Sequence, residues 1–232
     1  MGTRIETVAF DADDTLWHNE SIFQMTQRRF EELLVDYAGP EHLAERILTT
    51  EKDNLRHYGY GVKGYALSLI ETAIEVSDGK VPASVIAQVL DFAKEMLAHP
   101  VEVLPGVRET VEDLKDRYRL IVITKGDLMD QEQKIARSGL GDLFQAVEIV
   151  SEKDESTYRR LFNRHGSGPA SAVMVGNSVR SDILPALAAG AFAAHVPYPL
   201  TWAHEAAAAP ENEPRYRLLE RVDELPGWLA GL

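Results

Sequence analysis

Acidic, amide, hydroxyl and ammonium side chains recur in this sequence just after short apolar runs. These side chains belong to Asp11, Asp13, Thr124, Lys153, Asn177, Ser178 and Asp182. The apolar runs before them are Thr7–Phe10, Leu120–Ile123, Ala146–Val150 and Ala172–Val175. Short runs rich in Val and Ile with polar residues at their ends are typical of buried strands. If the strands are parallel, their polar ends meet at one edge of the sheet, where ligands bind.

The chemistry of such a cluster is restricted by its charges. Two carboxylates about 4 Å apart repel each other by roughly 4 kcal/mol at an effective dielectric constant of 20, so they share a proton or bind a cation. Oxygen ligands favour Mg²⁺ over Zn²⁺. The chain has no Cys, which excludes thiolate ligands and thiolate catalysis. A carboxylate held against a phosphate group can act as a nucleophile, and a nearby Lys and hydroxyl would stabilise the phosphoryl oxygens.

The elements that position these residues alternate along the chain. The helical periodicity predicts helices at Val107–Tyr118, Leu128–Ser138, Thr157–His165 and Ile183–Ala189, and a weaker fifth strand at Ala193–Val196. Alternating strands and helices predict a parallel sheet that is covered on both faces. Glu205–Pro214 is expected to be a polar loop, and Arg215–Leu229 is expected to form a last helix.

A long segment interrupts this alternation after the first strand. Residues 19–102 contain no convincing strand, and four amphipathic helices are predicted there: Ile22–Tyr37, Glu41–Asn54, Tyr65–Val76 and Pro82–Ala98. The predicted division is therefore a core of residues 1–18 and 103–232, with a helical insertion at 19–102.

The composition excludes several classes of partner. With 24 Lys and Arg against 37 Asp and Glu, the formal charge is −13, which repels nucleic acid and anionic membranes. No apolar run approaches the roughly 18 residues of a membrane span. The run Ile5–Phe10 is too short for a secretory signal, so a cytoplasmic location is expected. No pattern in the sequence indicates the oligomeric state.

Four motifs resemble those of the haloacid dehalogenase (HAD) superfamily, in that family's order. Asp11-Ala12-Asp13-Asp14-Thr15 matches its DxDxT motif, and Ile121–Thr124 matches its strand ending in Thr or Ser. Lys153 stands where the third motif has Lys, and Gly176–Asp182 is similar to the fourth. The resemblance covers residues 5–18 and 103–200. It implies an α/β fold, a Rossmann-like doubly wound parallel sheet core with a helical C1-type cap inserted after the first strand.

The resemblance also implies a role for each matching residue. Asp11 would attack phosphorus and form an aspartyl-phosphate, while Asp13 would act as general acid and then as general base. Thr124 and Lys153 would hold the phosphoryl group. Taken alone, Thr124 is more typical of a helix cap or of a satisfied hydroxyl at a strand end, and Lys153 lies in a charged stretch typical of a solvated loop.

The implied metal ion is Mg²⁺, with Asp11, the backbone carbonyl of Asp13, Asp182 and Asn177 around it. Three positions depart from the family's pattern. Asn177 stands where an acid is common, so weaker Mg²⁺ binding is expected, through its carbonyl or a water molecule. Asp14 replaces a common Gly, and Asp tolerates unusual backbone angles. Lys125 replaces a frequent Asn and would add positive charge near the phosphate.

The implied activity is phosphatase action on a small phosphorylated metabolite, since a cap obstructs a folded protein substrate. Phosphomutase activity is the main alternative, because water or substrate could accept the phosphoryl group. A dehalogenase is disfavoured by Asp13, because a halide needs no proton donor. A receiver-like phospho-Asp signalling module is disfavoured by the insertion at 19–102.

The segment Gly59–Gly64 matches GxGxxG but does not follow a hydrophobic strand, so a dinucleotide fingerprint is not expected there. A loop of the insertion is predicted instead, with Lys63, Tyr60 or Tyr65 in contact with the substrate's leaving group. None of the seven His residues forms an HxH or HxxxH pair, which argues against zinc. His18 is the one His expected near the site.

Overall fold

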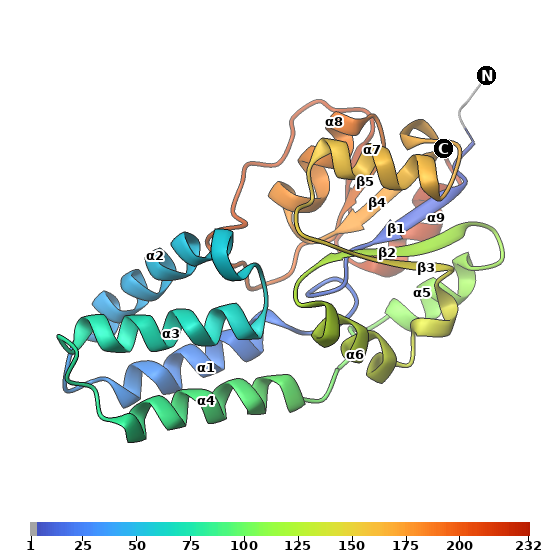
Figure 1. Cartoon of the computed structure of the whole chain (residues 1–232). Coiled ribbons are helices and arrows are strands. Elements are labelled where there is room, and N and C mark those ends of the chain that lie inside the picture. The colour runs from blue at the N-terminus through green and yellow to red at the C-terminus, as the bar shows by residue number, and fades with distance from the viewer. Residues whose placement is uncertain (1–3) are drawn as a thin grey trace. The chain divides into compact units, whose positions relative to one another are not determined.

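The computed structural model describes residues 4–232. The larger of its two units is built on a six-stranded parallel sheet, most of whose strands are labelled in Figure 1. The strand order is β3-β2-β1-β4-β5-β6. The strands are β1 (Thr7–Phe10), β2 (Arg119–Lys125), β3 (Ala146–Val150), β4 (Ala172–Gly176), β5 (Phe192–His195) and β6 (Tyr216–Leu218). Phe10 of β1 pairs with Val122 on one side and with Val175 on the other. The first strand therefore lies between the two strands that end near Thr124 and Asn177.

Helices cover both faces of the sheet, as the apolar runs predict. Alternate residues of β1 point to opposite faces: Val8 and Phe10 lie in one apolar cluster, and Ala9 lies in another. The first cluster includes residues of α5 (Val107–Leu114), α6 (Leu128–Ser138) and α9 (Leu225–Leu229). The second includes residues of α7 (Glu155–Arg164) and α8 (Leu184–Ala189). This is the doubly wound, Rossmann-like arrangement.

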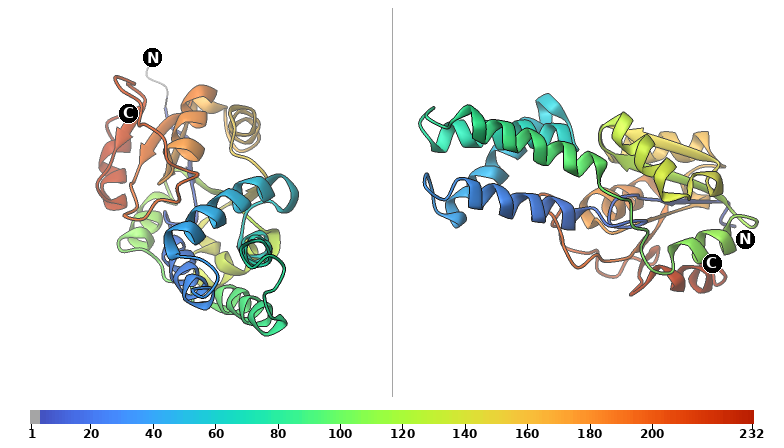
Figure 2. Two further views of the ribbon diagram at one scale, coloured as in Figure 1. Left: turned by 90° about the vertical axis from the view of Figure 1, so that its left-hand side faces the viewer. Right: turned by 90° about the horizontal axis from the view of Figure 1, so that it is seen from below.

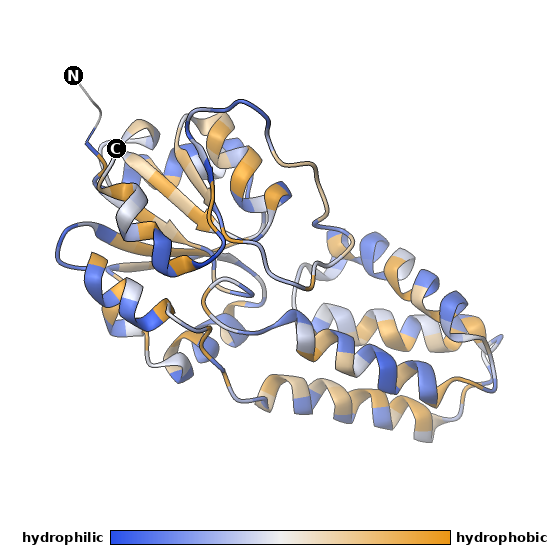
Figure 3. Cartoon of the chain, turned by 180° about the vertical axis from the view of Figure 1, so that it is seen from behind, coloured by the Kyte–Doolittle hydropathy of each residue, from blue (hydrophilic) through white to orange (hydrophobic). Residues whose placement is uncertain are grey.

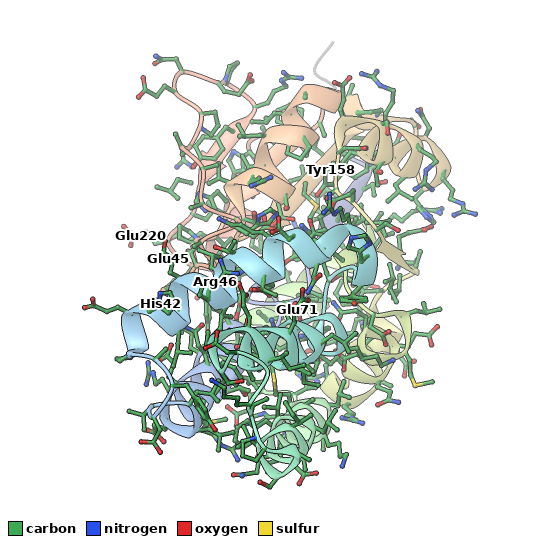
Figure 4. The ribbon with its side chains drawn as sticks, turned by 60° about the vertical axis from the view of Figure 1, so that its left-hand side comes forward. His42, Glu45, Arg46, Glu71, Tyr158 and Glu220 are labelled. Atoms are coloured by element: carbon green, nitrogen blue, oxygen red, sulfur yellow. The ribbon has the colours of Figure 1, made fainter. Side chains whose placement is uncertain are left out.

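Four long helices form a separate apolar core (Figures 2 and 3). They are α1 (Glu20–Leu33), α2 (Pro40–Tyr58), α3 (Val62–Val76) and α4 (Ala83–Ala98). Helix α3 packs on α2 and α4, and α1 packs on the same two helices. Phe30, Leu43 and Leu69 are fully buried between them. At the polar surface of this unit, Arg46, which is labelled in Figure 4, makes an ion pair with Glu75.

The chain divides into two compact units. One holds the residues up to His18, Val101–Lys125 and Gln131–Leu232, and the other holds Asn19–Pro100 and Gly126–Asp130. The short segment 126–130 therefore groups with the four helices, which no sequence pattern indicates. Its Asp127 accepts a hydrogen bond at 2.9 Å from Lys63. Among the described residues, no helix is long and apolar enough to cross a membrane.

The C-terminal segment differs from its prediction. A helix at Arg215–Leu229 is wrong, because the segment begins with the edge strand β6 and continues through a 3₁₀ turn (Val222–Glu224) into the short helix α9. Tyr216 pairs with Ala193, so hydrogen bonds to β5 stabilise a strand whose outer residues stay exposed. A strand of three residues is too short for its alternation of apolar and polar residues to reveal it.

Other predicted boundaries shift by a few residues. Helix α2 continues to Tyr58 and α5 ends at Leu114, whereas Asn54 and Tyr118 were the predicted ends. The loop predicted at Gly59–Gly64 is shorter, because α3 begins at Val62 and includes Gly64. A π turn (Val179–Ile183) precedes α8, which begins at Leu184.

Candidate active site

The first strand delivers Asp11 to the carboxyl edge of the sheet. The Asp11 backbone N–H donates to the carbonyl of Val175 at 2.8 Å, so the β1–β4 pairing continues to this residue. Thr124, on the other neighbouring strand, is 1% exposed and lies in the last part of β2. The site therefore rests on three adjacent strands whose backbones fix one another.

Lys153 lies at the centre of the buried charges. It follows β3, and its ammonium donates to Asp11 Oδ1 and, at 2.7 Å, to Asp182 Oδ1. Its side chain is 1% exposed. Burial by itself would lower the pKa of Lys153, but the carboxylates of Asp11 and Asp182 outweigh burial and raise it above its ordinary value. Lys153 is therefore a permanent cation between two acids.

Burial has the opposite effect on the carboxyl group of Asp11. Desolvation raises the pKa of Asp11 to about 7, with Lys153 opposing the shift and Asp182 adding to it. One ammonium cannot neutralise two buried carboxylates, so this edge of the sheet retains excess negative charge. A cation or a shared proton removes that excess.

Asp13 is held in a separate set of hydrogen bonds. Its Oδ1 accepts from Trp17 Nε1 at 2.8 Å and from Lys134 Nζ at 2.6 Å. Its Oδ2 accepts from Gln131 Nε2 at 3.0 Å. These three donors fix the direction of the Asp13 carboxylate.

Gln131 and Lys134 were not predicted from the sequence. They are three residues apart on α6 and so share one helix face. Gln131 also donates to Thr124 Oγ1 at 2.8 Å and to the Lys125 carbonyl at 2.7 Å, so one amide joins Asp13 to the end of β2. Nothing in the sequence alone distinguishes these two side chains from other polar residues of an amphipathic helix.

Asn177 lies against two of the predicted metal ligands. One terminal atom of its amide is 3.1 Å from Thr15 Oγ1, 3.2 Å from Asp11 Oδ2 and 3.3 Å from the Asp13 carbonyl oxygen. With the amide nitrogen at this point, it donates to all three oxygens. Hydrogen bonding favours the nitrogen at this point, because an oxygen there would face the oxygens of Asp11 and Asp13 without a proton between them. Turned toward a bound cation, the amide oxygen would join the oxygens of Asp11 and Asp13. Such a group of oxygens suits a hard cation such as Mg²⁺, so the residues present fit the implied ion.

Asp182 has a different environment. Its Oδ2 accepts the backbone N–H of Ser178 at 2.9 Å, while Oδ1 accepts from Lys153. A Cβ on Gly176 would lie 2.2 Å from Asp182 Oδ2, so this approach requires glycine. Between residues 4 and 232, no group of three or more His, Cys, Asp and Glu side chains forms a metal cluster. A metal role for Asp182 therefore stays a prediction.

A buried tyrosine of α7 holds the turn that carries Asp182. The hydroxyl of Tyr158, which is labelled in Figure 4, donates to the Ser181 carbonyl at 2.9 Å. Tyr158 belongs to α7 and is fully buried. The turn after β4 is thus attached to the core below it.

The family assignment rests on a comparison that spans most of the chain. The model of the haloacid dehalogenase-like hydrolases matches residues 5–190. This chain is a haloacid dehalogenase-like hydrolase. A crystal structure of a haloacid dehalogenase-like family hydrolase from Xanthomonas campestris is 40% identical and superposes with a TM-score of 0.89, covering 99% of this chain and 92% of that one.

Two further relatives of this HAD hydrolase are more distant. A glyceraldehyde 3-phosphate phosphatase of Methanothermobacter thermautotrophicus is 28% identical over 80% of this chain and 83% of its own length. A HAD hydrolase of Bacillus subtilis, solved bound to magnesium, is 16% identical with a TM-score of 0.68, covering 97% of this chain and 99% of that one. At this identity the second likeness shows the fold alone.

The remaining residues predicted to contact the substrate or to lie near the site are divided between the two units. Lys63 is 54% exposed and donates to Asp127, and Tyr65 is buried with its ring 5.0 Å from that of Phe23. Their contact with a substrate, like that of Tyr60, stays a prediction. His18 Nδ1 lies 2.6 Å from the hydroxyl of Tyr198, in the same unit as the sheet.

Proposed function

We propose that this HAD hydrolase is a Mg²⁺-dependent phosphatase that hydrolyses a small phosphorylated metabolite through an aspartyl-phosphate on Asp11. The observation that carries the proposal is the arrangement of the two acids of the DxDxT motif. Asp11 contacts the buried ammonium of Lys153, whereas Asp13 has its own donors in Trp17 and Lys134. This difference in surroundings supports nucleophilic attack by Asp11 and proton transfer by Asp13.

In the first step, an oxygen of Asp11 forms a bond to phosphorus while the bond from phosphorus to the leaving oxygen breaks. Asp13 gives its proton to that oxygen, which leaves as an alcohol. In the second step, water attacks phosphorus, Asp13 takes its proton, and the bond between phosphorus and Asp11 breaks. Lys153 and Thr124 stabilise the negative charge on the transferred group throughout.

The presence of an acid at position 13 favours esters over halides. An alkoxide is a poor leaving group and needs a proton, whereas a halide leaves without one. The three donors around Asp13 keep its carboxylate in one direction, as a group that passes a proton to a leaving oxygen requires.

For the metal ion, we propose Asp11, the Asp13 carbonyl and Asp182 as ligands, with Asn177 acting through its carbonyl or a water molecule. When bound, Mg²⁺ would neutralise the charge of the phosphoryl group and of the buried acids. The grouped oxygens at Asn177 support this proposal, as does magnesium in a relative with the same fold. Neutral Asn177 in place of an acid predicts modest affinity.

The substrate class follows from the relatives and from charge. A relative at 28% identity is named for its action on glyceraldehyde 3-phosphate, and a formal charge of −13 disfavours nucleic acid and other polyanions. We therefore propose a small phosphate monoester.

The test is phosphate release from a panel of small phosphate monoesters with Mg²⁺, with EDTA, and with Asp11→Asn. We expect turnover that requires Mg²⁺ and falls by about 10³-fold or more in Asp11→Asn, because the nucleophile is lost. Asp113→Asn is the matched control, since Asp113 is a surface acid paired with Arg117. Full activity of Asp11→Asn, or equal turnover in EDTA, would contradict the proposal.

A further inference from the structure

Glu205 lies in a site built from three donors. Its Oε1 accepts from Lys125 Nζ at 2.8 Å, and its Oε2 accepts from the hydroxyls of Ser178 and Ser181, each at 2.5 Å. Lys125 also donates to Ser181 Oγ at 2.9 Å. An ammonium and two hydroxyls are the groups that bind a carboxylate or a phosphate. Lys125, Ser178 and Ser181 are called the anion cradle below.

The cradle spans the end of the first strand. Lys125 is the last residue of β2, and Ser178 and Ser181 follow β4. Strands β2 and β4 are the two neighbours of β1 in the sheet. Asp11 follows β1 between them. The ammonium of Lys125 thus reaches across the strand that ends at the proposed nucleophile, and the cradle adjoins the place proposed for the phosphoryl group.

The cradle is enclosed, and its occupant is ionised. The side chains of Lys125 and Glu205 are only 11% and 14% exposed. Burial alone would raise the pKa of Glu205, but Lys125 and the two serine hydroxyls lower it to about 2. Removing one partner of a buried ion pair of this kind strongly destabilises the folded protein, because the other charge stays buried without a partner.

The residue that fills the cradle comes from a loop without regular structure. Glu205 lies in the loop between β5 and β6 (residues 196–215), where the sequence predicts only a polar segment. The neighbouring His204 carbonyl accepts from Arg180 at 2.7 Å. The loop is therefore attached beside the turn that bears Asp182, although none of its residues belongs to the four motifs.

We propose that Glu205 is a specificity-determining residue: it fills an anion subsite beside the phosphoryl site and thereby excludes substrates that carry a second anionic group there. This inference rests on the proposed phosphatase function. With Glu205 in place, Lys125 is neutralised and unavailable, and a second carboxylate on the substrate meets a carboxylate of the protein. The preferred ester then has a neutral leaving group. Without Glu205, the cradle presents an ammonium and two hydroxyls to such a carboxylate.

The first experiment compares matched esters. The pairs are 2-hydroxyethyl phosphate with 2-phosphoglycolate, and glycerol 3-phosphate with 3-phosphoglycerate, assayed with Mg²⁺. We expect the wild type to prefer the neutral member of each pair. Glu205→Ala should shift the ratio of kcat/KM toward the carboxylate member by about ten-fold in at least one pair. Glu205→Gln, which still fills the cradle but carries no charge, should shift it less.

An unchanged ratio in Glu205→Ala for both pairs would overturn the proposal. If Glu205→Ala fails to fold, Glu205→Gln decides, because loss of the charge alone predicts a measurable shift. If the folded wild type hydrolyses none of the four esters or the wider panel, the phosphatase proposal fails, and the subsite is judged by the binding measurement below.

The second experiment needs no turnover. In Glu205→Ala, sodium acetate should raise Tm above that in sodium chloride of equal ionic strength, because acetate replaces the missing carboxylate. The wild type and the double variant Lys125→Met/Glu205→Ala should show no such difference. An equal response of Glu205→Ala and the double variant would show that the cradle binds no anion.

Discussion

At the scale of single residues, the ammonium of Lys153 is hydrogen-bonded to two buried carboxylates, those of Asp11 and Asp182. Lys153→Met should lower the free energy of unfolding by about 3 kcal/mol, because it leaves Asp11 and Asp182 buried and unpaired. It should also abolish measurable phosphate release. Denaturant unfolding and the phosphatase assay measure the two effects, and Lys94→Met is the control, since Lys94 pairs with Asp91 on the surface. If Lys153→Met unfolded at the same denaturant concentration as the wild type, the ion pairs of Lys153 would contribute no stability.

The residues around the site differ in how far the sequence predicts them. Asp11 and Thr124 are recognisable because each stands at the end of an apolar run typical of a buried strand. Lys153 was assigned by its resemblance to the third family motif, since its charged stretch is also typical of a solvated loop. Asp14 has a φ of 61°, as expected for an Asp in place of glycine. Lys134 was missed, because a lysine on an amphipathic helix has the same local pattern whether it faces water or an acid. Glu205 was missed because only the folded loop places it beside Lys125.

At the scale of elements, the end of β4 depends on a residue without a side chain. Gly176→Ala should disrupt the turn that carries Asp182, because its Cβ would lie 2.2 Å from Asp182 Oδ2, and the turn or the carboxylate must move. We expect loss of activity together with a fall in Tm of several degrees. Gly227→Ala in α9 is the control, since no atom lies within 4 Å of its added Cβ. Wild-type activity of Gly176→Ala would show that Asp182 need not stay in place.

The strands of the sheet were predictable to different degrees. Leu120–Ile123 is apolar at every position because β2 is covered on both faces, and such runs have few other structures open to them. The edge strand β6 is short and partly exposed, and its pairing with β5 is decided by tertiary contact alone. The same holds for Gly126–Asp130, whose grouping with the helices depends on folded neighbours such as Lys63.

At the scale of the whole molecule, stability should depend on pH through Glu20. Burial raises the pKa of this half-buried acid to about 7, above its ordinary value of 4.5, with a hydrogen bond from Gln24 opposing the shift. The folded state therefore holds the proton more tightly than the unfolded chain. The resulting stabilisation is full below about pH 4.5 and is lost as pH rises through about 7.

Glu20→Gln should remove this dependence. Between pH 5 and 8, the wild type should lose about 2 kcal/mol more of its unfolding free energy than Glu20→Gln. Denaturant unfolding at several pH values measures the difference. Glu41→Gln removes an exposed acid from the same unit as the control. Parallel pH profiles for the wild type and Glu20→Gln would contradict the expectation.

The membership of Gly126–Asp130 in the helical unit bears on how relatives of this protein can be recombined. The chain passes between the two units four times, at residues 18–19, 100–101, 125–126 and 130–131, rather than twice. A chimera that exchanges residues 19–100 alone would therefore part Asp127 from Lys63, and it would leave the five-residue piece facing a foreign surface. Chimeras of such hydrolases should fold more often when residues 19–100 and 126–130 are exchanged together.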